Sequence, residues 1–261
     1  MKLLNEIIEK KRSEIIESKR KYTIRELVDF ELYQEERRSL KKALIKGTGI
    51  IAEYKRSSPS AGHITSAGID EVLGDYMSNN VSALSILTDQ HFFKGQVEDL
   101  KAARKYGVPI LRKDFIIDEF QLFEAKAFGA DAVLLIAEVL DSYHVKYLCQ
   151  IAQSLNLEVL VEFHSEKELF KVPSSADIIG INNRNLDTLE TSIENCKTLL
   201  PYLPLNAFKI AESGIKSLDE IEELYELGFN GCLIGESLLK EPRFRTEIRS
   251  LKSPENFATC A

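Results

Sequence analysis

Eight short apolar segments, separated by stretches with helical spacing, constrain the fold of this chain more than any other feature. The eight segments are rich in Val, Ile, Leu and Ala and lie at 49–55, 81–88, 108–113, 131–136, 157–163, 177–182, 207–212 and 230–235. Between them, apolar residues recur at three- and four-residue intervals, and several of these stretches end in a Gly that commonly stops a helix. Alternating strands and helices predict a parallel sheet, because each parallel crossover needs a long connection that is usually a helix.

The number of units favours a closed barrel over an open, doubly wound sheet. Eight strand and helix units in about 200 residues are typical of a (β/α)8 TIM barrel, and no GxGxxG motif follows the first strand. Residues 1–47 precede that strand, and we expect them to be helical in two pieces, near 2–19 and 32–45, that cap the barrel or cover its mouth. We therefore expect one domain over 1–261, with an N-terminal helical extension at 1–47, a barrel at 48–250 and a frayed tail after Arg249.

Charge and hydropathy exclude several classes of partner. The net charge of -7 and a pI near 5.4 argue against a surface that binds nucleic acid or acidic lipid. The first residues, MKLLNEIIEKKRSEI, are charged throughout and lack the apolar core of a signal peptide. No apolar run approaches the roughly 18 residues of a membrane span. We expect a cytoplasmic protein that binds neither nucleic acid nor membrane.

The cysteines and histidines do not indicate a metal site. They are widely spaced and form no CxxC, HxH or HExxH motif. We expect reduced thiols and no metal at these positions, which are Cys149, Cys196, Cys232, Cys260, His63, His91, His144 and His164.

Acidic, basic and amide side chains collect where five of the predicted strands end. They are Glu53 and Lys55, Lys113 and Asp114, Glu162, Asn182 and Arg184, and Glu212 and Ser213. In a (β/α)8 barrel the active site lies at the carboxyl ends of the strands, so these side chains should converge on one mouth. Strand alternation places Glu53 and Lys55 on one face and pairs Asn182 with Arg184. Charged groups at so many strand ends favour an active site over ordinary solvated surface.

Two glycine turns indicate a phosphate site. Gly214 lies in ESGI after the seventh strand, and Gly235 lies in IGES after the eighth strand. The loops after strands seven and eight are the usual phosphate position in these barrels, where free backbone N–H groups attract anions. Tight turns alone are the alternative for either glycine. The Ser- and Pro-rich stretch KRSSPSAGHI after the first strand has the composition of a mobile substrate loop.

Seven segments resemble, in order, the motifs of the indole-3-glycerol phosphate synthase family. They are IIAEYKRSSPSAG, LTDQHFFKG, PILRKDFI, LVEFH, IIGINNRNL, AESGI and LIGESLL, and they span roughly residues 50–240. The resemblance implies a carboxy-lyase of tryptophan biosynthesis that uses no cofactor. It would convert 1-(2-carboxyphenylamino)-1-deoxyribulose 5-phosphate into indole-3-glycerol phosphate, carbon dioxide and water.

The same resemblance implies a role for each matching residue. Lys113 would be the general acid of ring closure, Glu53 and Glu162 the acid/base carboxylates, and Lys55 an acid in dehydration; the roles of Lys55 and Glu162 could be exchanged. Substrate would be held by Phe93, Asn182, Arg184, Glu212 and Ser213, with Phe92 as the alternative to Phe93. Phosphate would be bound by Ser58, Gly214, Gly235 and Glu236. A carboxylate repels phosphate, so we expect the backbone N–H of Glu236 to face the ligand.

Two other functions are compatible with parts of the pattern. Lys113 on a barrel strand near a phosphate site also suits a Schiff-base aldolase, and a barrel that only binds a phosphorylated metabolite would need no acids and bases. The ordered motifs favour the synthase over both. We expect a small phosphorylated substrate as the main partner and a monomer in solution, with a homodimer as the alternative.

Overall fold

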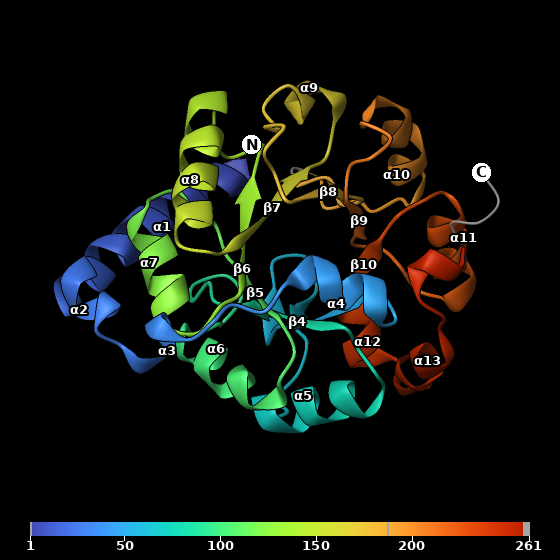
Figure 1. The fold of residues 1–261 in the computed structure, drawn as a ribbon, viewed down its shortest axis with the longest axis horizontal. Helices are drawn as coiled ribbons and strands as arrows, with labels where there is room; N and C mark the ends of the chain where they lie inside the picture. Colours follow the sequence, from blue (N-terminus) through green and yellow to red (C-terminus); the bar gives the residue numbers. More distant parts are fainter. Residues whose placement is uncertain (1, 187, 258–261) are drawn as a thin grey trace.

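The computed structural model describes residues 2–186 and 188–257, and its centre is a closed barrel of eight parallel strands (Figure 1). The strands run around the barrel in chain order, and β1 closes it by pairing with both β4 and β10. They are β1 (Ile50–Tyr54), β4 (Ala83–Leu87), β5 (Ile110–Lys113), β6 (Ala132–Ile136), β7 (Glu158–Phe163), β8 (Ile178–Asn182), β9 (Lys209–Glu212) and β10 (Gly231–Ile234). The predicted (β/α)8 barrel is confirmed, and each strand lies within its predicted segment.

Helices cover the outside of the barrel, as crossovers between parallel strands require. The main ones are α5 (Ile69–Ser78), α6 (Glu98–Ala103), α7 (Phe120–Ala127), α8 (Ser142–Ser154), α9 (Glu166–Leu169), α10 (Glu194–Leu199), α11 (Leu218–Glu226), α12 (Glu236–Lys240) and α13 (Pro242–Glu247). Side chains on the outer strand face, such as Val133 and Val159, pack against these helices. None of the helices in the described ranges is long and apolar enough to cross a membrane.

Side chains on the inner strand face fill the barrel. Ile51, Leu111, Leu160 and Ile210 belong to one buried cluster inside it. Polar side chains replace these apolar ones only toward the carboxyl ends of the strands, as in Glu162, two residues after Leu160. The apolar side chains therefore form a packed floor inside the barrel, and polar groups for chemistry are present above it at the carboxyl ends of the strands.

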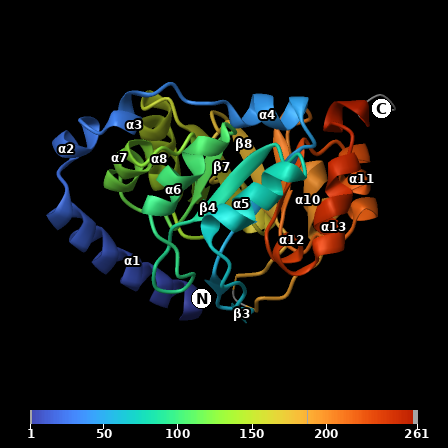
Figure 2. The ribbon, with the colours of Figure 1, turned by 90° about the horizontal axis from the view of Figure 1, so that it is seen from below.

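The N-terminal extension places one helix at each end of the barrel. Helix α1 (Lys2–Lys21) lies at one end, beside the start of the chain, and α4 (Leu40–Lys46) lies at the other (Figure 2). Leu40 and Leu44 of α4 join the inner cluster, and Glu158 at the start of β7 accepts hydrogen bonds from Ser39 Oγ (2.6 Å) and the Lys41 N–H (3.0 Å). The helix α4 thus caps the amino ends of the strands, which leaves α1 at the carboxyl ends.

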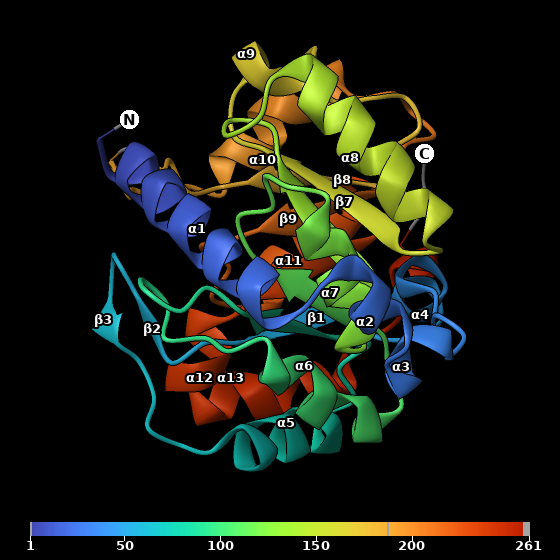
Figure 3. The same cartoon turned by 90° about the vertical axis from the view of Figure 1, so that its left-hand side faces the viewer.

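The second predicted N-terminal helix, 32–45, is wrong as a single element. The chain forms α2 (Ile24–Val28) and α3 (Glu31–Gln34), which lie against α7 (Figure 3), and then runs extended to Ser39, the N-cap of α4. Arg37 and Arg38 hold the extended stretch by donating hydrogen bonds to the carbonyl oxygens of Ala130 (2.9 Å) and Val108 (2.8 Å). These bonds tie the linker to the barrel and compete with continuous helix.

The tail after Arg249 is ordered as far as Phe257, contrary to the predicted frayed end. Pro254 is buried, Ser253 Oγ donates a hydrogen bond to the Ile45 carbonyl oxygen (2.7 Å), and the Phe257 ring packs edge-on against Tyr225. The tail therefore packs against α4 and α11 at the closed end of the barrel. Cys260 lies outside the described residues, and the other three cysteines are buried free thiols.

Candidate active site

Lys113 lies between two carboxylates at the open end of the barrel. Its Nζ atom is 2.9 Å from Glu162 Oε2 and 3.2 Å from Glu212 Oε2. The three side chains come from the ends of β5, β7 and β9, so the closed sheet brings together residues that are far apart in sequence. Both carboxylates are buried. The predicted convergence of strand-end side chains is present at these three positions.

The charges in this cluster determine its protonation. Burial lowers the pKa of Lys113, but the carboxylates of Glu162, Glu212 and Glu53 raise it further, so the net shift is upward. Burial is the largest influence on Glu162 and would raise its pKa, but the Lys113 charge together with hydrogen bonds from Lys113, Asn182 and Glu212 leaves that pKa lowered. Burial raises the pKa of Glu212 to about 8, with Lys113 opposing the shift and the Glu162 charge adding to it. At neutral pH Lys113 therefore keeps its proton, Glu162 is ionised and Glu212 is largely protonated.

Glu53 and Lys55 form a second acid and base pair across the mouth. They share one strand face, as alternation predicts, and Lys55 Nζ lies 2.7 Å from Glu53 Oε1. Glu53 is buried and Lys55 is only partly exposed. An ammonium and a carboxylate in contact at the edge of the cavity can each exchange a proton with a bound molecule.

Asn182 and Arg184 extend the cluster along β8. Asn182 Nδ2 donates a hydrogen bond to Glu162 Oε1 (2.8 Å), and Asn182 Oδ1 accepts one from the Arg184 N–H (2.9 Å). The Arg184 guanidinium donates to the Leu189 carbonyl oxygen (2.9 Å). Asn182 therefore fixes the orientation of the Glu162 carboxylate, and Arg184 projects from the same strand end over the cavity.

The inner compartment of the cavity is mostly apolar. Phe93 is in its wall and packs against Phe115, with ring centroids 6.3 Å apart, whereas Phe92 is not among the lining residues. Other apolar walls come from α1 and from the loop after β8; these residues are Leu3, Leu4, Ile7, Leu186 and Leu189. Ser58 also lines this compartment, and its Oγ accepts a hydrogen bond from the Ala61 N–H (3.1 Å). A flat aromatic group fits such a setting.

The outer compartment is polar and is bounded by the two predicted glycine turns. Gly214, Gly235 and Glu236 line it together with Ser60 and Ala61, the residues that follow Ser58 and Pro59. The turn after β9 is left-handed at both Ser213 (φ 68°) and Gly214 (φ 76°). Cations at its rim include Arg184, Lys216, Lys240 and Arg243. Cations gathered at the rim of a polar compartment suit an anionic ligand.

The Glu236 carboxylate is held by cations at this rim. It lies 2.7 Å from Lys240 Nζ and 3.9 Å from an Arg184 nitrogen. The hydrogen bond from Lys240 lowers the pKa of Glu236 more than partial burial raises it. The side chain is thus directed to its own cations, which is compatible with a backbone contact to phosphate.

The loop after β1 is a short hairpin at the same end of the barrel. Its strands are β2 (Ser57–Ser58) and β3 (Gly62–His63), which pair antiparallel, and Figure 3 shows them projecting beside the start of α1. The hairpin supplies Ser58, Ser60 and Ala61 to the cavity walls.

The comparisons with known proteins agree with this geometry. A family model described as indole-3-glycerol phosphate synthase matches residues 4–251. An indole-3-glycerol phosphate synthase of Bacteroides thetaiotaomicron is 46% identical over 244 residues, which cover 92% of this chain and 94% of that protein. The chain belongs to the indole-3-glycerol phosphate synthase family. A second synthase, from Aliarcobacter butzleri, is 38% identical and covers 97% of this chain and all of its own length.

Membership of the indole-3-glycerol phosphate synthase family confirms the resemblance found in the sequence. The protein is a lyase of tryptophan biosynthesis that catalyses a decarboxylating ring closure. Solved structures show the same fold at low identity. A 3-hexulose-6-phosphate synthase from Salmonella typhimurium has a TM-score of 0.59 at 15% identity and covers 80% of this chain and 96% of its own. A tryptophan synthase α-subunit from Pyrococcus furiosus has a TM-score of 0.56 at 14% identity, with 82% and 98% covered.

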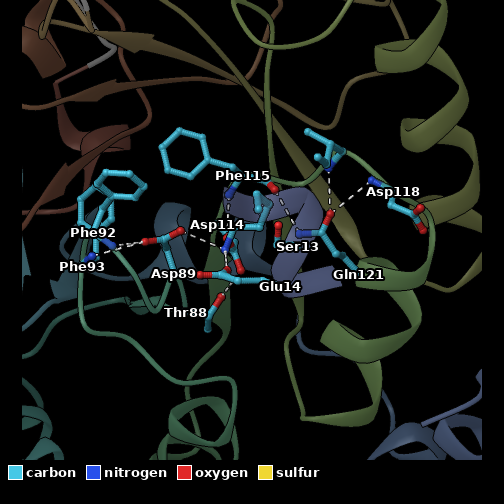
Figure 4. A network of polar contacts seen from close by, with 12 residues as sticks. Ser13, Glu14, Thr88, Asp89, Phe92, Phe93, Asp114, Phe115, Asp118 and Gln121 are labelled. Carbon is cyan, nitrogen blue, oxygen red and sulfur yellow. Dashed lines mark hydrogen bonds and ion pairs between the residues drawn. The ribbon is translucent and has the colours of Figure 1, made fainter. Parts of the chain in front are cut away.

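Sequence reasoning missed a buried ionic network of the synthase that connects α1 to the cavity. Lys11 Nζ lies 2.9 Å from Asp89 Oδ2 and 2.8 Å from Asp114 Oδ1. Asp89 accepts hydrogen bonds from the N–H groups of Phe92 and Phe93, and Asp114 accepts one from Thr88 Oγ1 (Figure 4). One buried lysine therefore joins the aromatic wall to the residue that follows Lys113.

The sequence pointed to this network only through Asp114, which follows Lys113. Its partner Lys11 on α1 was not predictable. Lys11 lies in the charged run EKKRSE, which is typical of a solvated helix face. Among the described residues, no group of three or more His, Cys, Asp or Glu side chains could hold a metal ion.

Proposed function

We propose that the chain converts 1-(2-carboxyphenylamino)-1-deoxyribulose 5-phosphate into indole-3-glycerol phosphate, carbon dioxide and water. The carboxyphenyl ring would occupy the inner compartment against Phe93, and the phosphate would lie at Gly214, Gly235 and the Glu236 N–H. The ketone of the substrate would then lie between the compartments, next to Lys113. The observation that carries this proposal is the position of Lys113, which contacts Glu162 and Glu212 and lines both the apolar and the polar compartment.

Ring closure requires a proton donor at the ketone oxygen. The ring carbon that bears the carboxylate attacks the ketone carbon, and the oxygen gains negative charge as the new bond forms. Lys113 supplies the proton, because the neighbouring carboxylates keep it charged until a stronger base appears. Attack leaves positive charge on the ring and amine, which Glu53 and Glu162 stabilise.

Decarboxylation follows without an acid. The bond from the ring carbon to the carboxylate breaks, carbon dioxide leaves, and the electron pair returns to the ring to restore its aromaticity. The apolar inner compartment favours this step, because the carboxylate loses hydration before it leaves as a neutral molecule.

Dehydration needs one acid and one base. Lys55 protonates the departing hydroxyl, and Glu53 removes the proton from the adjacent carbon. The two groups are in contact at 2.7 Å, so substrate must separate them for the groups to act on opposite sides of the new ring. Glu162 is the alternative base and Lys55 and Glu162 could exchange roles, as the sequence also allowed. Asn182, Arg184 and Ser213 orient the substrate, and Ser58 binds the phosphate from the loop after β1. Glu212 was expected to line the pocket, but it is buried beneath it and is absent from the lining of both compartments, so it acts through its contact with Lys113.

The aldolase alternative is disfavoured by the same charges. A lysine that forms an imine must lose its proton, and such lysines are activated by a lowered pKa. Burial alone would lower the pKa of Lys113, but the acidic side chains around it raise it instead. Borohydride with a sugar phosphate should therefore leave no covalent adduct on the protein.

We also propose that the protein acts as a single-domain monomer in the cytoplasm, with the homodimer as the alternative. The buried free thiols support a reducing compartment. The proposed route uses no cofactor.

A direct assay tests the proposed reaction. Purified protein and the carboxyphenylamino-deoxyribulose phosphate should produce indole fluorescence together with one carbon dioxide per indole. The chain has no Trp, so the protein adds little background. A folded protein that releases carbon dioxide without forming indole-3-glycerol phosphate, or that forms neither product, would contradict the proposal.

A further inference from the structure

Gly180 lies inside β8 among the side chains of the active site. It pairs in register with Glu162 on β7, and two residues later Asn182 pairs with Glu212 on β9. Positions on the inner face of a barrel strand usually carry bulky side chains that fill the interior. A glycine at this position leaves space where the fold would normally place a side chain.

The space above Gly180 is occupied by the Glu212 carboxyl group. A Cβ atom on Gly180 would overlap Glu212 Oε1, and it would lie 3.0 Å from Leu160 Cδ1. Gly180 does not have a positive φ angle, so an L side chain meets no backbone strain there. The requirement for glycine is therefore steric and comes mainly from Glu212.

Gly235 has the same relation to the Glu53 carboxylate as Gly180 has to Glu212. A Cβ atom on Gly235 would lie 2.5 Å from Glu53 Oε1. Gly235 also lines the outer compartment, so a substitution there would disturb two functions at once. Gly180 provides the cleaner test, because it is absent from the lining residues of both compartments.

We propose that Gly180 is a positioning residue whose missing side chain forms the seat of the Glu212 carboxyl group. The seat holds Glu212 3.2 Å from Lys113 Nζ. Without it, the carboxyl group has to rotate away from the floor of the barrel and alter its spacing to both Lys113 and Glu162. The inference rests on the proposed role of Glu212 in the active site.

The protonation of Glu212 gives the seat a measurable consequence. Burial is the main cause that raises the pKa of Glu212 to about 8, and the charge of Glu162 adds to it. A carboxyl group displaced from the seat is less buried and lies farther from Glu162, so its pKa falls toward the ordinary value for Glu. A loss of stability alone would not change this value.

The variant Gly180→Ala tests the seat through turnover. We expect kcat to fall by about tenfold or more with KM within about threefold, because the floor lies away from both compartments. In the parent, the ionisation of Glu212 should produce a limb near pH 8 in the pH dependence of kcat, and in Gly180→Ala this limb should move to lower pH. The control Gly74→Ala adds a methyl group on α5, where the nearest atom outside the helix is Tyr106 Oη at 3.9 Å, and should leave kcat and its pH dependence unchanged.

Two double variants separate Glu212 from Leu160. Gly180→Ala/Glu212→Asp shortens the acid by one methylene and should recover part of the lost kcat. Gly180→Ala/Leu160→Val relieves only the contact with Leu160 and should not recover it. Recovery by Leu160→Val and not by Glu212→Asp would overturn the proposal.

A double-mutant cycle of melting temperatures tests the seat without any turnover measurement. It therefore still applies if the proposed reaction is wrong. Gly180→Ala should lower the Tm by several degrees in the parent and by much less in the Glu212→Ala background, where the overlapping carboxyl group is absent. An equal loss of Tm in both backgrounds would overturn the proposal. An unchanged pH dependence of kcat in Gly180→Ala would do the same.

Discussion

The Lys113 ammonium lies 2.9 Å from the Glu162 carboxylate, although the two residues come from strands β5 and β7 that are separated by β6. Both residues face the inside of the barrel, and Asn182 on β8 holds the second oxygen of Glu162. Their relative position is therefore set by the register of four neighbouring strands. A rigid ion pair of this kind places the acid before substrate arrives.

Because the buried ion pairs of Lys11 join α1 to the barrel, we predict that they contribute strongly to the stability of the folded protein. Lys11→Met leaves Asp89 and Asp114 buried beside the missing charge, and breaking a buried pair costs about 3–5 kcal/mol. The KM should also rise, because Leu3, Leu4 and Ile7 on the same helix line the inner compartment. Thermal unfolding and steady-state turnover measure the two effects.

Lys19→Met on the same helix is the matched control. Lys19 pairs with Asp118 at 2.7 Å, but Lys19 is exposed and Asp118 is partly exposed, and such a surface pair contributes about 0–1 kcal/mol. If Lys11→Met lowers the Tm no more than Lys19→Met does, the buried network does not anchor α1.

The raised pKa of Glu212 predicts a pH-dependent effect on stability. A carboxyl group whose folded pKa is raised to about 8 contributes stability below the ordinary pKa of Glu, and this contribution is lost as the pH rises through 8. Glu212→Gln removes the charge and should increase the Tm at pH 9 relative to the parent. The gain at pH 9 should exceed the change at pH 5 by about 2 °C or more, which is on the order of 1 kcal/mol for a chain of this size.

Circular dichroism melting at the two pH values measures this difference. Equal shifts in Tm at pH 5 and pH 9 would mean that Glu212 ionises normally in the folded protein.

A substitution in the turn after β9 should weaken phosphate binding. A second glycine variant separates this effect from the effect of backbone strain. Gly214→Ala adds a Cβ at a φ of 76°, 3.2 Å from Thr191 Cβ, and should raise KM about tenfold with a small change in kcat. Gly107→Ala has the same strain at a φ of 77° with no atom within 4 Å of the added Cβ, and it lies on the loop before β5.

Both glycine variants should lose about 1 kcal/mol of stability. Only Gly214→Ala should weaken inhibition by inorganic phosphate, measured by steady-state kinetics. A similar rise in KM for Gly107→Ala would remove the case for a phosphate contact at Gly214.

The features predicted from sequence are those that depend on local periodicity. Strand alternation correctly placed Glu53 and Lys55 on one face, and the β-barrel topology then brought Lys113 near Glu162. Lys11 could not be recognised in the same way, because an amphipathic pattern identifies the buried face of a helix but not a single charge that faces a partner. Its role depends on two aspartates that are 78 and 103 residues away in the chain.

The other differences also arise from tertiary contacts. Glu35 to Ser39 has a composition that is compatible with helix, but Arg37 and Arg38 bind carbonyl oxygens at the amino ends of the barrel strands and keep it extended. The tail to Phe257 has little apolar periodicity, and Pro254 and Phe257 order it by packing against α4 and α11. Neither contact leaves a pattern in the local sequence.

The role of Lys113 as the acid of ring closure is tested most directly by the turnover of Lys113→Met, followed by indole fluorescence. Loss of a positioned general acid typically costs about 10²–10⁴ in rate, so kcat should fall by at least about 100-fold. Lys146→Met, an exposed lysine on α8, should match the parent. A kcat for Lys113→Met within about threefold of the parent, with the protein folded, would contradict the account.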